Sequence, residues 1–138
     1  MSYDFLMFVR RDSFPAPSRL ADELRPDGLV MPPALDISAA DGFVPIADTG
    51  FEVCCSDLTE AHVAEHQNAL REAGEPDDEH LAILRASDLF VSFGCHDDRE
   101  IAVAKLVAGA IAKLSNGYVC DPQTGEVVRG DYLSGPYL

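Results

Sequence analysis

The fold is decided by residues Leu89–Cys120, which read LFVSFGCHDDREIAVAKLVAGAIAKLSNGYVC. The apolar run at its start predicts a strand, and Asp97 or Asp98 then caps a helix over residues 99–114, because a short acidic side chain accepts bonds from free N–H groups of the first turn. Asn116-Gly117 ends this helix, since both residue types tolerate left-handed backbone angles. The next residues, up to Cys120, predict a second strand.

The helix over residues 99–114 carries apolar side chains around most of its circumference. Val103, Val107 and Ile111 lie in one arc with their neighbours at helical spacing, and alanines widen that arc. We therefore expect the most buried helix of the protein, with only the side that carries Lys105, Gly109 and Lys113 in water.

The rest of the chain shows shorter patterns. Two β-rich runs separated by Ala47-Asp48-Thr49-Gly50 predict a hairpin, and Ser56-Asp57 followed by Glu60 resembles a capping box that opens a second helix, which Gly74 ends. Residues His80–Gly94 are expected to be extended, and an acidic turn precedes them at 75–79. The expected elements outside 89–120 are a strand at 3–9, a short helix within 13–24 with Ser18 as its cap, strands at 43–46 and 51–55, a helix at 56–73, an extended run at 81–84 and a strand at 126–128.

This order of elements predicts a single α+β domain over residues 1–138. Its expected architecture is a sandwich of a mainly antiparallel sheet with three helices on one face, and the ferredoxin-like arrangement is the closest simple model.

Length and composition exclude several classes of protein. With 138 residues, 47% of them hydrophobic, the chain is sized for one packed domain rather than for two or for a disordered segment. Its net charge of −14 disfavours nucleic acid and anionic membranes as partners. The N-terminus lacks the pattern of a secretory signal, so we expect a cytoplasmic protein with reduced thiols.

The acidic residues are concentrated in one part of the chain. Residues 27–79 contain 13 acidic residues and one basic residue, Arg71, so 12 of the 14 net negative charges lie there. A solvated surface explains such a block as well as a basic partner does, although interspersed lysines would give solubility with less repulsion. The residues expected to contact a basic partner are Asp48, Glu52, Glu60, Glu65, Glu72, Asp77 and Asp78.

The segment His62-Val63-Ala64-Glu65-His66 matches the H-x-x-E-H motif of inverted zinc peptidases. Two histidines four residues apart on a helix lie side by side and can share a metal ion. Both histidines also fall within the apolar arc of their helix, so two partly buried neutral imidazoles explain the pattern equally well. We predict that they are structural and hold no catalytic metal.

Cysteine chemistry is the other enzymatic possibility. Cys95 lies between a strand and a helix, where a thiolate can be stabilised, but Asp97, Asp98 and Glu100 oppose its negative charge. A metal held by Cys54, Cys55, Cys95 and His96 would need adjacent cysteines to face the same way, which a strand does not allow. We expect these cysteines and Cys120 to be structural, and we expect no cofactor.

Two segments carry a family resemblance. Residues Ala108–Glu126, with an Ala-rich helix, a glycine, a strand and the Asp-Pro-Gln-Thr-Gly turn, are similar to a segment of small bacterial α+β proteins, and Tyr3–Phe8 resembles the first strand of those proteins. Proteins of this type include immunity proteins encoded beside polymorphic or secretion-delivered toxins. The resemblance implies a protein that binds and neutralises a cognate toxin, and it carries over no catalytic residue.

The sequence hypothesis is therefore a non-enzymatic cytoplasmic immunity protein that occludes a basic toxin with an acidic surface. One alternative is a small metal- or thiol-dependent enzyme that uses His62, Glu65 and His66, or Cys95. A second alternative is a structural or adaptor subunit. The sequence does not indicate an oligomeric state.

Overall fold

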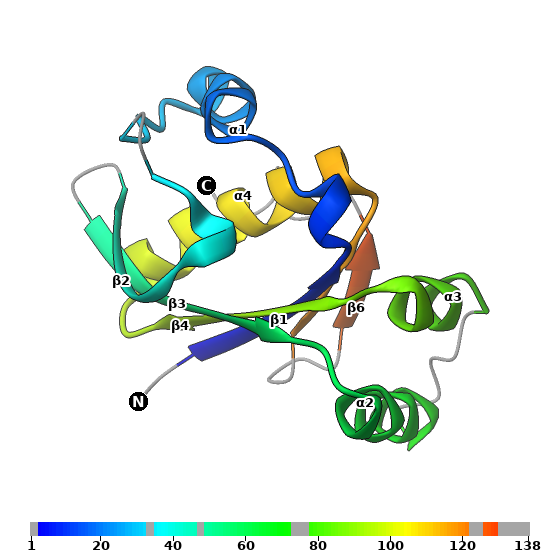
Figure 1. Cartoon of the computed structure of the whole chain (residues 1–138). Coiled ribbons are helices and arrows are strands. Elements are labelled where there is room, and N and C mark those ends of the chain that lie inside the picture. Colours follow the sequence, from blue (N-terminus) through cyan, green and yellow to red (C-terminus); the bar gives the residue numbers. More distant parts are fainter. Residues whose placement is uncertain (1–2, 33–34, 47–48, 73–77, 122–125, 130–138) are drawn as a thin grey trace.

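The computed structural model describes residues 3–32, 35–46, 49–72, 78–121 and 126–129. They form one α+β domain around a six-stranded sheet with the strand order β2-β3-β4-β1-β5-β6, in which all neighbouring strands are antiparallel (Figure 1). The strands are β1 (Tyr3–Val9), β2 (Asp41–Ile46), β3 (Thr49–Asp57), β4 (Leu89–Cys95), β5 (Tyr118–Asp121) and β6 (Glu126–Arg129). The α-helices are α1 (Pro17–Leu24), α2 (Glu60–Glu72), α3 (Asp78–Ala86) and α4 (Asp98–Ser115).

The ferredoxin-like expectation describes the centre of this sheet. Strands β5, β1, β4 and β3 are adjacent in that order, with α1 after β1 and α4 after β4, which is a βαββαβ arrangement. Strand β2 extends one edge and β6 the other. The α2–α3 pair joins β3 to β4, where the simple arrangement has a short turn.

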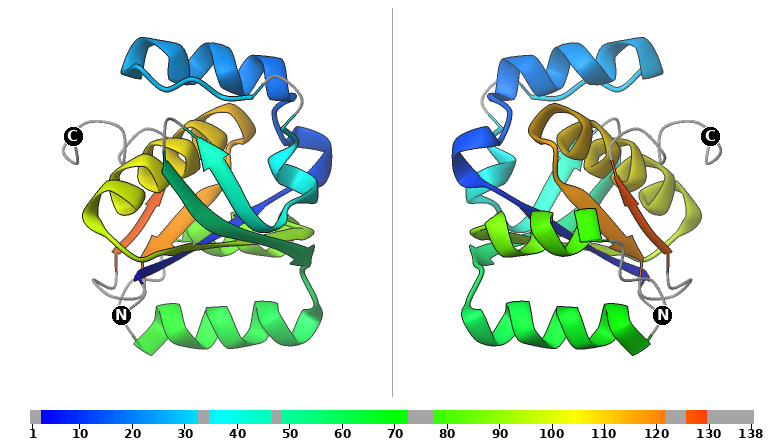
Figure 2. Two further views of the ribbon diagram at one scale, coloured as in Figure 1. Left: turned by 90° about the vertical axis from the view of Figure 1, so that its left-hand side faces the viewer. Right: turned by 90° about the vertical axis from the view of Figure 1, so that its right-hand side faces the viewer.

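The helices cover both faces of the sheet, so the expectation of helices on one face is wrong. Figure 2 shows α1 and α4 on one side and α2 and α3 on the other. The physical reason lies in β1, which is apolar on both sides. Phe5 and Met7 join the large core beneath α4, whereas Phe8 packs with Leu81 and Leu84 of α3. We call these two sides of the sheet the α4 face and the α2 face.

Helix α4 is the most buried helix, as predicted. Asp97 caps it by accepting a bond from the Glu100 N–H at 2.8 Å, and Asn116 ends it in the left-handed region with φ 58°. The prediction that the side with Lys105, Gly109 and Lys113 faces water is wrong in part, because Lys105 and Gly109 are buried. The Lys105 Nζ lies 5.4 Å from the centre of the Tyr3 ring and 5.5 Å from that of Phe5, so aromatic faces surround the ammonium.

Helix α3 occupies residues that the sequence suggested were extended. Residues 81–84 are Leu-Ala-Ile-Leu, and Leu81 and Leu84, three positions apart, are buried together against Phe8. A short apolar run fits the periods of both helix and strand, so only packing could decide between them. The described residues therefore form four α-helices, where the sequence predicted three. The expected acidic turn is divided, because Asp78 and Glu79 begin α3 and residues 75–77 lie outside the described part.

Two helix starts differ from the prediction. Helix α1 begins with Pro17 after Ala16, so Ser18 is not its cap. Strand β3 continues through Ser56 and Asp57, and Thr59 caps α2 by accepting a bond from the His62 N–H at 3.2 Å. The expected helix end at Ala73-Gly74 lies outside the described residues.

Candidate protein-binding surface

Within the part of the chain that the structure describes, no helix covers one end of the α2 face. Helices α2 and α3 lie beneath the end of the sheet where β3 leads into α2, and the opposite end of that face is open (Figure 1). Strand alternation directs to this open part the side chains of Asp41, Phe43 and Pro45 from β2, Glu52 and Cys54 from β3, and Asp4 from β1. We call these six residues the open strip. All are exposed except Asp4, which is partly exposed.

Three of these residues form one row across the sheet with Gly94. In the register, Phe43 pairs with Glu52, Glu52 with Gly94, and Gly94 with Asp4. The position of a Cβ on Gly94 would be 3.5 Å from Asp4 Oδ1 and 3.6 Å from Glu52 Oε2, so these two oxygens lie within about 7 Å of each other. At that distance two carboxylates repel by about 0.6 kcal/mol even in bulk water.

Neither Asp4 nor Glu52 forms an ion pair with another described residue. Four Arg and Lys side chains form ion pairs with carboxylates outside the open strip, at N···O distances between 2.6 and 2.9 Å. These pairs are Arg10–Asp12, Arg11–Asp57, Arg25–Asp22 and Lys113–Glu23. Among the described residues, therefore, no cation neutralises the open strip by an ion pair.

Phe43 places an aromatic side chain at the edge of this acidic row. It is 71% exposed, and its ring occupies the space where a Cβ on Gly50 would stand. The ring thus covers the backbone of the neighbouring strand on one side and contacts water on the other. A large exposed aromatic group beside carboxylates is typical of the anchor positions in protein interfaces.

Helix α2 contributes further unpaired carboxylates on the same face of the sheet. Glu60, Glu65 and Glu72 are all exposed, and none forms an ion pair with a described cation. Glu65 and Glu72 are seven residues apart and lie on one stripe of the helix, whereas Glu60 lines a shallow pocket with Arg85.

The structure places the remaining predicted contact residues in different ways. Glu52 belongs to the open strip, and Asp78 is the first residue of α3. Asp48 and Asp77 lie outside the described residues. Sequence reasoning missed Asp4 and Phe43 as contact residues. The alternation of side chains in Tyr3–Met7 already placed Asp4 on the other side of the strand from buried Phe5 and Met7. Which residues of other strands lie beside Asp4 could be known only from the strand order.

The two histidines of the H-x-x-E-H motif pack against aromatic rings. The His62 and His66 rings each stack on Phe90 with centroids 5.7 Å apart, and His66 meets Phe8 edge-on at 4.5 Å. Burial lowers the pKa of His66, while His62 Nδ1 is buried and has no hydrogen-bond partner among the described residues. Glu65 is exposed, and no group of three His, Cys, Asp or Glu side chains within the described residues is placed to hold a metal ion.

Cys54, Cys55 and Cys95 are free thiols in settings that oppose ionisation. Cys95 is fully buried in β4, and burial raises its pKa to about 12, with Glu100 and Asp4 adding to the effect. Burial likewise raises the pKa of Cys55 to about 11, and its Sγ donates to the Ile37 carbonyl at 3.0 Å. Exposed Cys54 lies beside Asp41, and its pKa is also raised, chiefly by desolvation. A nucleophilic cysteine needs the opposite environment.

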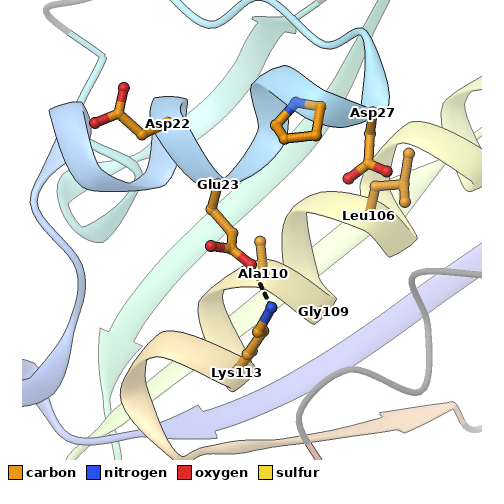
Figure 3. Close-up of a pocket in the computed structure, with 8 residues that line it drawn as sticks. Asp22, Glu23, Asp27, Leu106, Gly109, Ala110 and Lys113 are labelled. Atoms are coloured by element: carbon orange, nitrogen blue, oxygen red, sulfur yellow. Dashed lines mark hydrogen bonds and ion pairs between the residues drawn. The ribbon is translucent and has the colours of Figure 1, made fainter.

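A pocket of about 330 Å³ lies between α1 and α4 (Figure 3). Its floor is Leu106, Gly109 and Ala110, and acidic residues line its rim. Glu23 points toward α4 and pairs with Lys113 at 2.7 Å, so part of the rim charge is neutralised within the domain (Figure 3). The pocket therefore presents less free charge than the open strip does.

In the described part of the chain, no helix has both the length and the apolar character needed to cross a membrane. Comparison with protein families, curated proteins and solved structures finds no match to this chain.

Proposed function

We propose that the protein is a non-enzymatic binding protein of the cytoplasm, an immunity protein that neutralises a cognate basic toxin by direct binding and occlusion. The observation that carries the proposal is the gathering, on one side of the sheet, of carboxylates that form no ion pair with a described cation. Those of the open strip come from β1, β2 and β3, and those of α2 lie on the same side.

Free carboxylates act on the rate at which a partner associates. A surface of one sign attracts a partner of the other sign before contact and raises the association rate by factors of about 10 to 1,000. Salt screens this attraction over about 8 Å at physiological ionic strength. The carboxylates of this side form no ion pair with a described cation, so their field is available to a basic protein.

The resemblance of residues Ala108–Glu126 to toxin-immunity proteins gives the partner its class. A toxin whose active site binds phosphate-rich substrates such as nucleic acid presents the basic surface that these carboxylates would complement. Occlusion by an acidic domain would then exclude the substrate by competing for the same cations.

The test has two stages. The tagged protein is used to capture partners from native lysate, and the product of any adjacent toxin-like reading frame is expressed with and without it. We expect a basic protein, bound directly, whose toxicity is lost on co-expression. A captured partner that is acidic, or a toxin whose activity persists in the complex, would contradict the proposal.

The second stage measures association with the purified partner by stopped flow. Replacing Glu60, Glu65 and Glu72 together by Gln should slow association at low salt and leave dissociation nearly unchanged, because rim charges act mainly on encounter. The matched control is Asp12→Asn with Asp22→Asn and Asp98→Asn, which removes three exposed carboxylates from other surfaces. Equal slowing in both variants, or an association rate indifferent to salt, would refute a role for the α2 carboxylates.

A further inference from the structure

We propose that helix α2 is held on the sheet by a pH-sensitive contact, in which His62 and His66 pack on Phe90 while neutral and release the helix when they bind protons. This device goes beyond the proposed function and needs no partner. In it the two histidines of the H-x-x-E-H segment act as a titrating pair and not as metal ligands.

The imidazole rings form much of the described contact between α2 and the sheet. Each ring stacks on Phe90 with its centroid 5.7 Å from that of Phe90, and His66 also meets Phe8 edge-on at 4.5 Å. Among the α2 side chains that the structure describes, none is fully buried, and those partly buried are His62, Val63, His66 and Gln67. Histidine is the side chain whose charge changes near neutral pH. Two of the four side chains that hold α2 can therefore become cations in mild acid.

Protonation places charge and donors where the docked helix offers little to receive them. His62 Nδ1 is buried and has no hydrogen-bond partner among the described residues. A protonated imidazole donates from both nitrogens, so this atom would become a buried donor without an acceptor, which is costly. One cation is attracted by the face of a ring, but two imidazoliums on the same Phe90 ring repel each other. Water solvates both charges once the helix has left the sheet.

The charged groups around the rings do not offset this cost. Burial has the largest effect on the pKa of His66 and lowers it, whereas Glu65 raises that pKa and His62 lowers it further. Glu65 is exposed, so water screens its attraction. The charged side chain described in α3, Arg85, is itself a cation.

The strands bring uncharged side chains to the part of the sheet that α2 covers. The carboxylates that β1, β2 and β3 direct to the α2 face belong to the open strip, which the helix leaves uncovered. The remaining described side chains that strand alternation turns to this face are Leu6 and Phe8 of β1, Ser56 of β3, and Phe90 and Ser92 of β4.

The sign of the response follows from where the proton binds more readily. A histidine in water has a pKa near 6.5, and docked His66 has a lower one, so a fall in pH favours the released helix. Between about pH 7.5 and about pH 5 the ratio of released to docked helix rises up to about 30-fold for one histidine, and up to about 1,000-fold if both respond. Release uncovers Phe90, while Leu81 and Leu84 of α3 still cover Phe8.

Native-state hydrogen exchange tests the device. Exchange of the α2 amides is compared with that of the α4 amides by mass spectrometry, after correction for the intrinsic effect of pH on amide exchange. We expect the α2 amides to exchange faster and to respond less to low concentrations of urea, because a local opening exposes less surface than unfolding does. Their protection should fall about tenfold or more between about pH 7.5 and about pH 5.

Variants identify the titrating groups. His62→Phe with His66→Phe keeps a ring at both positions and removes both titrations, so the protection of α2 should no longer depend on pH. The matched control, Glu72→Gln, changes an exposed carboxylate of the same helix and should keep the full response. Circular dichroism confirms that each variant is folded. Ring-nitrogen NMR of the unaltered protein is a second readout, in which His62 and His66 should titrate over the pH range where α2 loses protection.

A response that persists in the double variant, or that disappears in Glu72→Gln, would show that other groups control α2. Equal protection and equal urea dependence of α2 and α4 would show that the helix opens only with the whole domain, and the device would then not exist. Imidazole signals that titrate outside the range of the exchange response would also overturn it. These measurements need no toxin, so their failure leaves the proposed function to its own test.

Discussion

Gly117→Ala should destabilise the domain, although alanine is normally better tolerated than glycine in ordered structure. A Cβ at Gly117 would stand 2.7 Å from the Phe8 carbonyl oxygen and 3.3 Å from the Val9 Cβ. The first contact is with backbone, and Phe8 is paired on both sides, with Phe90 and with Tyr118. The carbonyl therefore cannot move away without disturbing the centre of the sheet.

The magnitude follows from two opposing effects. Overpacking of this kind costs about 1–3 kcal/mol, and the smaller conformational freedom of alanine in the unfolded chain returns about 0.4–1 kcal/mol. We expect a net loss of about 1–2 kcal/mol and a Tm lower by roughly 3–10 °C, given the scaling for domains of this size.

The assay is urea unfolding followed by far-ultraviolet circular dichroism, with Gly94→Ala as the matched control. The Cβ of that variant would make ordinary contacts of 3.5 and 3.6 Å, and alanine is favoured over glycine inside a strand. Its midpoint should equal or exceed that of the original protein. A Gly117→Ala midpoint that is unchanged, or an equal fall in Gly94→Ala, would refute this account of how α4 joins β5.

Three further predictions concern the core and the histidines. Val107→Asp should be severely destabilising because it places an unpaired charge in a fully buried position of α4, and a soluble variant with unchanged Tm would contradict that packing. Elemental analysis of protein purified without added metal should find zinc well below one equivalent, whereas stoichiometric zinc lost on His66→Ala would favour the enzyme alternative. Because burial lowers the pKa of His66 from 6.5, the unfolded chain binds the proton more readily, so the urea midpoint should fall as the pH decreases from about 6.5 toward 5. His66→Phe should flatten this slope.

Much of the secondary structure was predictable from local pattern. Helix α4 was recognised because its apolar arc, its acidic cap and its Asn-Gly stop agree with one another. The strands β1, β2, β3, β5 and β6 were recognised from β-rich runs and turn residues. The prediction that residues 81–84 are extended was wrong, because four apolar residues in succession fit the repeat of a helix and that of a strand equally well. The residue against which they pack as a helix, Phe8, comes from β1.

The surroundings of single side chains depended on the tertiary structure. The spacing of Lys105 suggested a wet position, but the rings of Tyr3 and Phe5, about a hundred residues earlier, cover it. The histidine spacing was consistent with a metal site or with partly buried rings, and Phe8 and Phe90 supply the partners for stacking. Sequence spacing reports which residues share an element, and it does not report what packs on that element.

For the candidate surface the division is the same. The sequence by itself determined the negative charge, its concentration between residues 27 and 79, and the alternation that turns Asp4 and Glu52 away from the core. Only the tertiary structure made them neighbours, because β4 is inserted between β1 and β3 in a register that sets Gly94 opposite both. The strand order depends on which arrangement buries the apolar faces of all strands together. That burial is a property of the assembled sheet and not of any one segment.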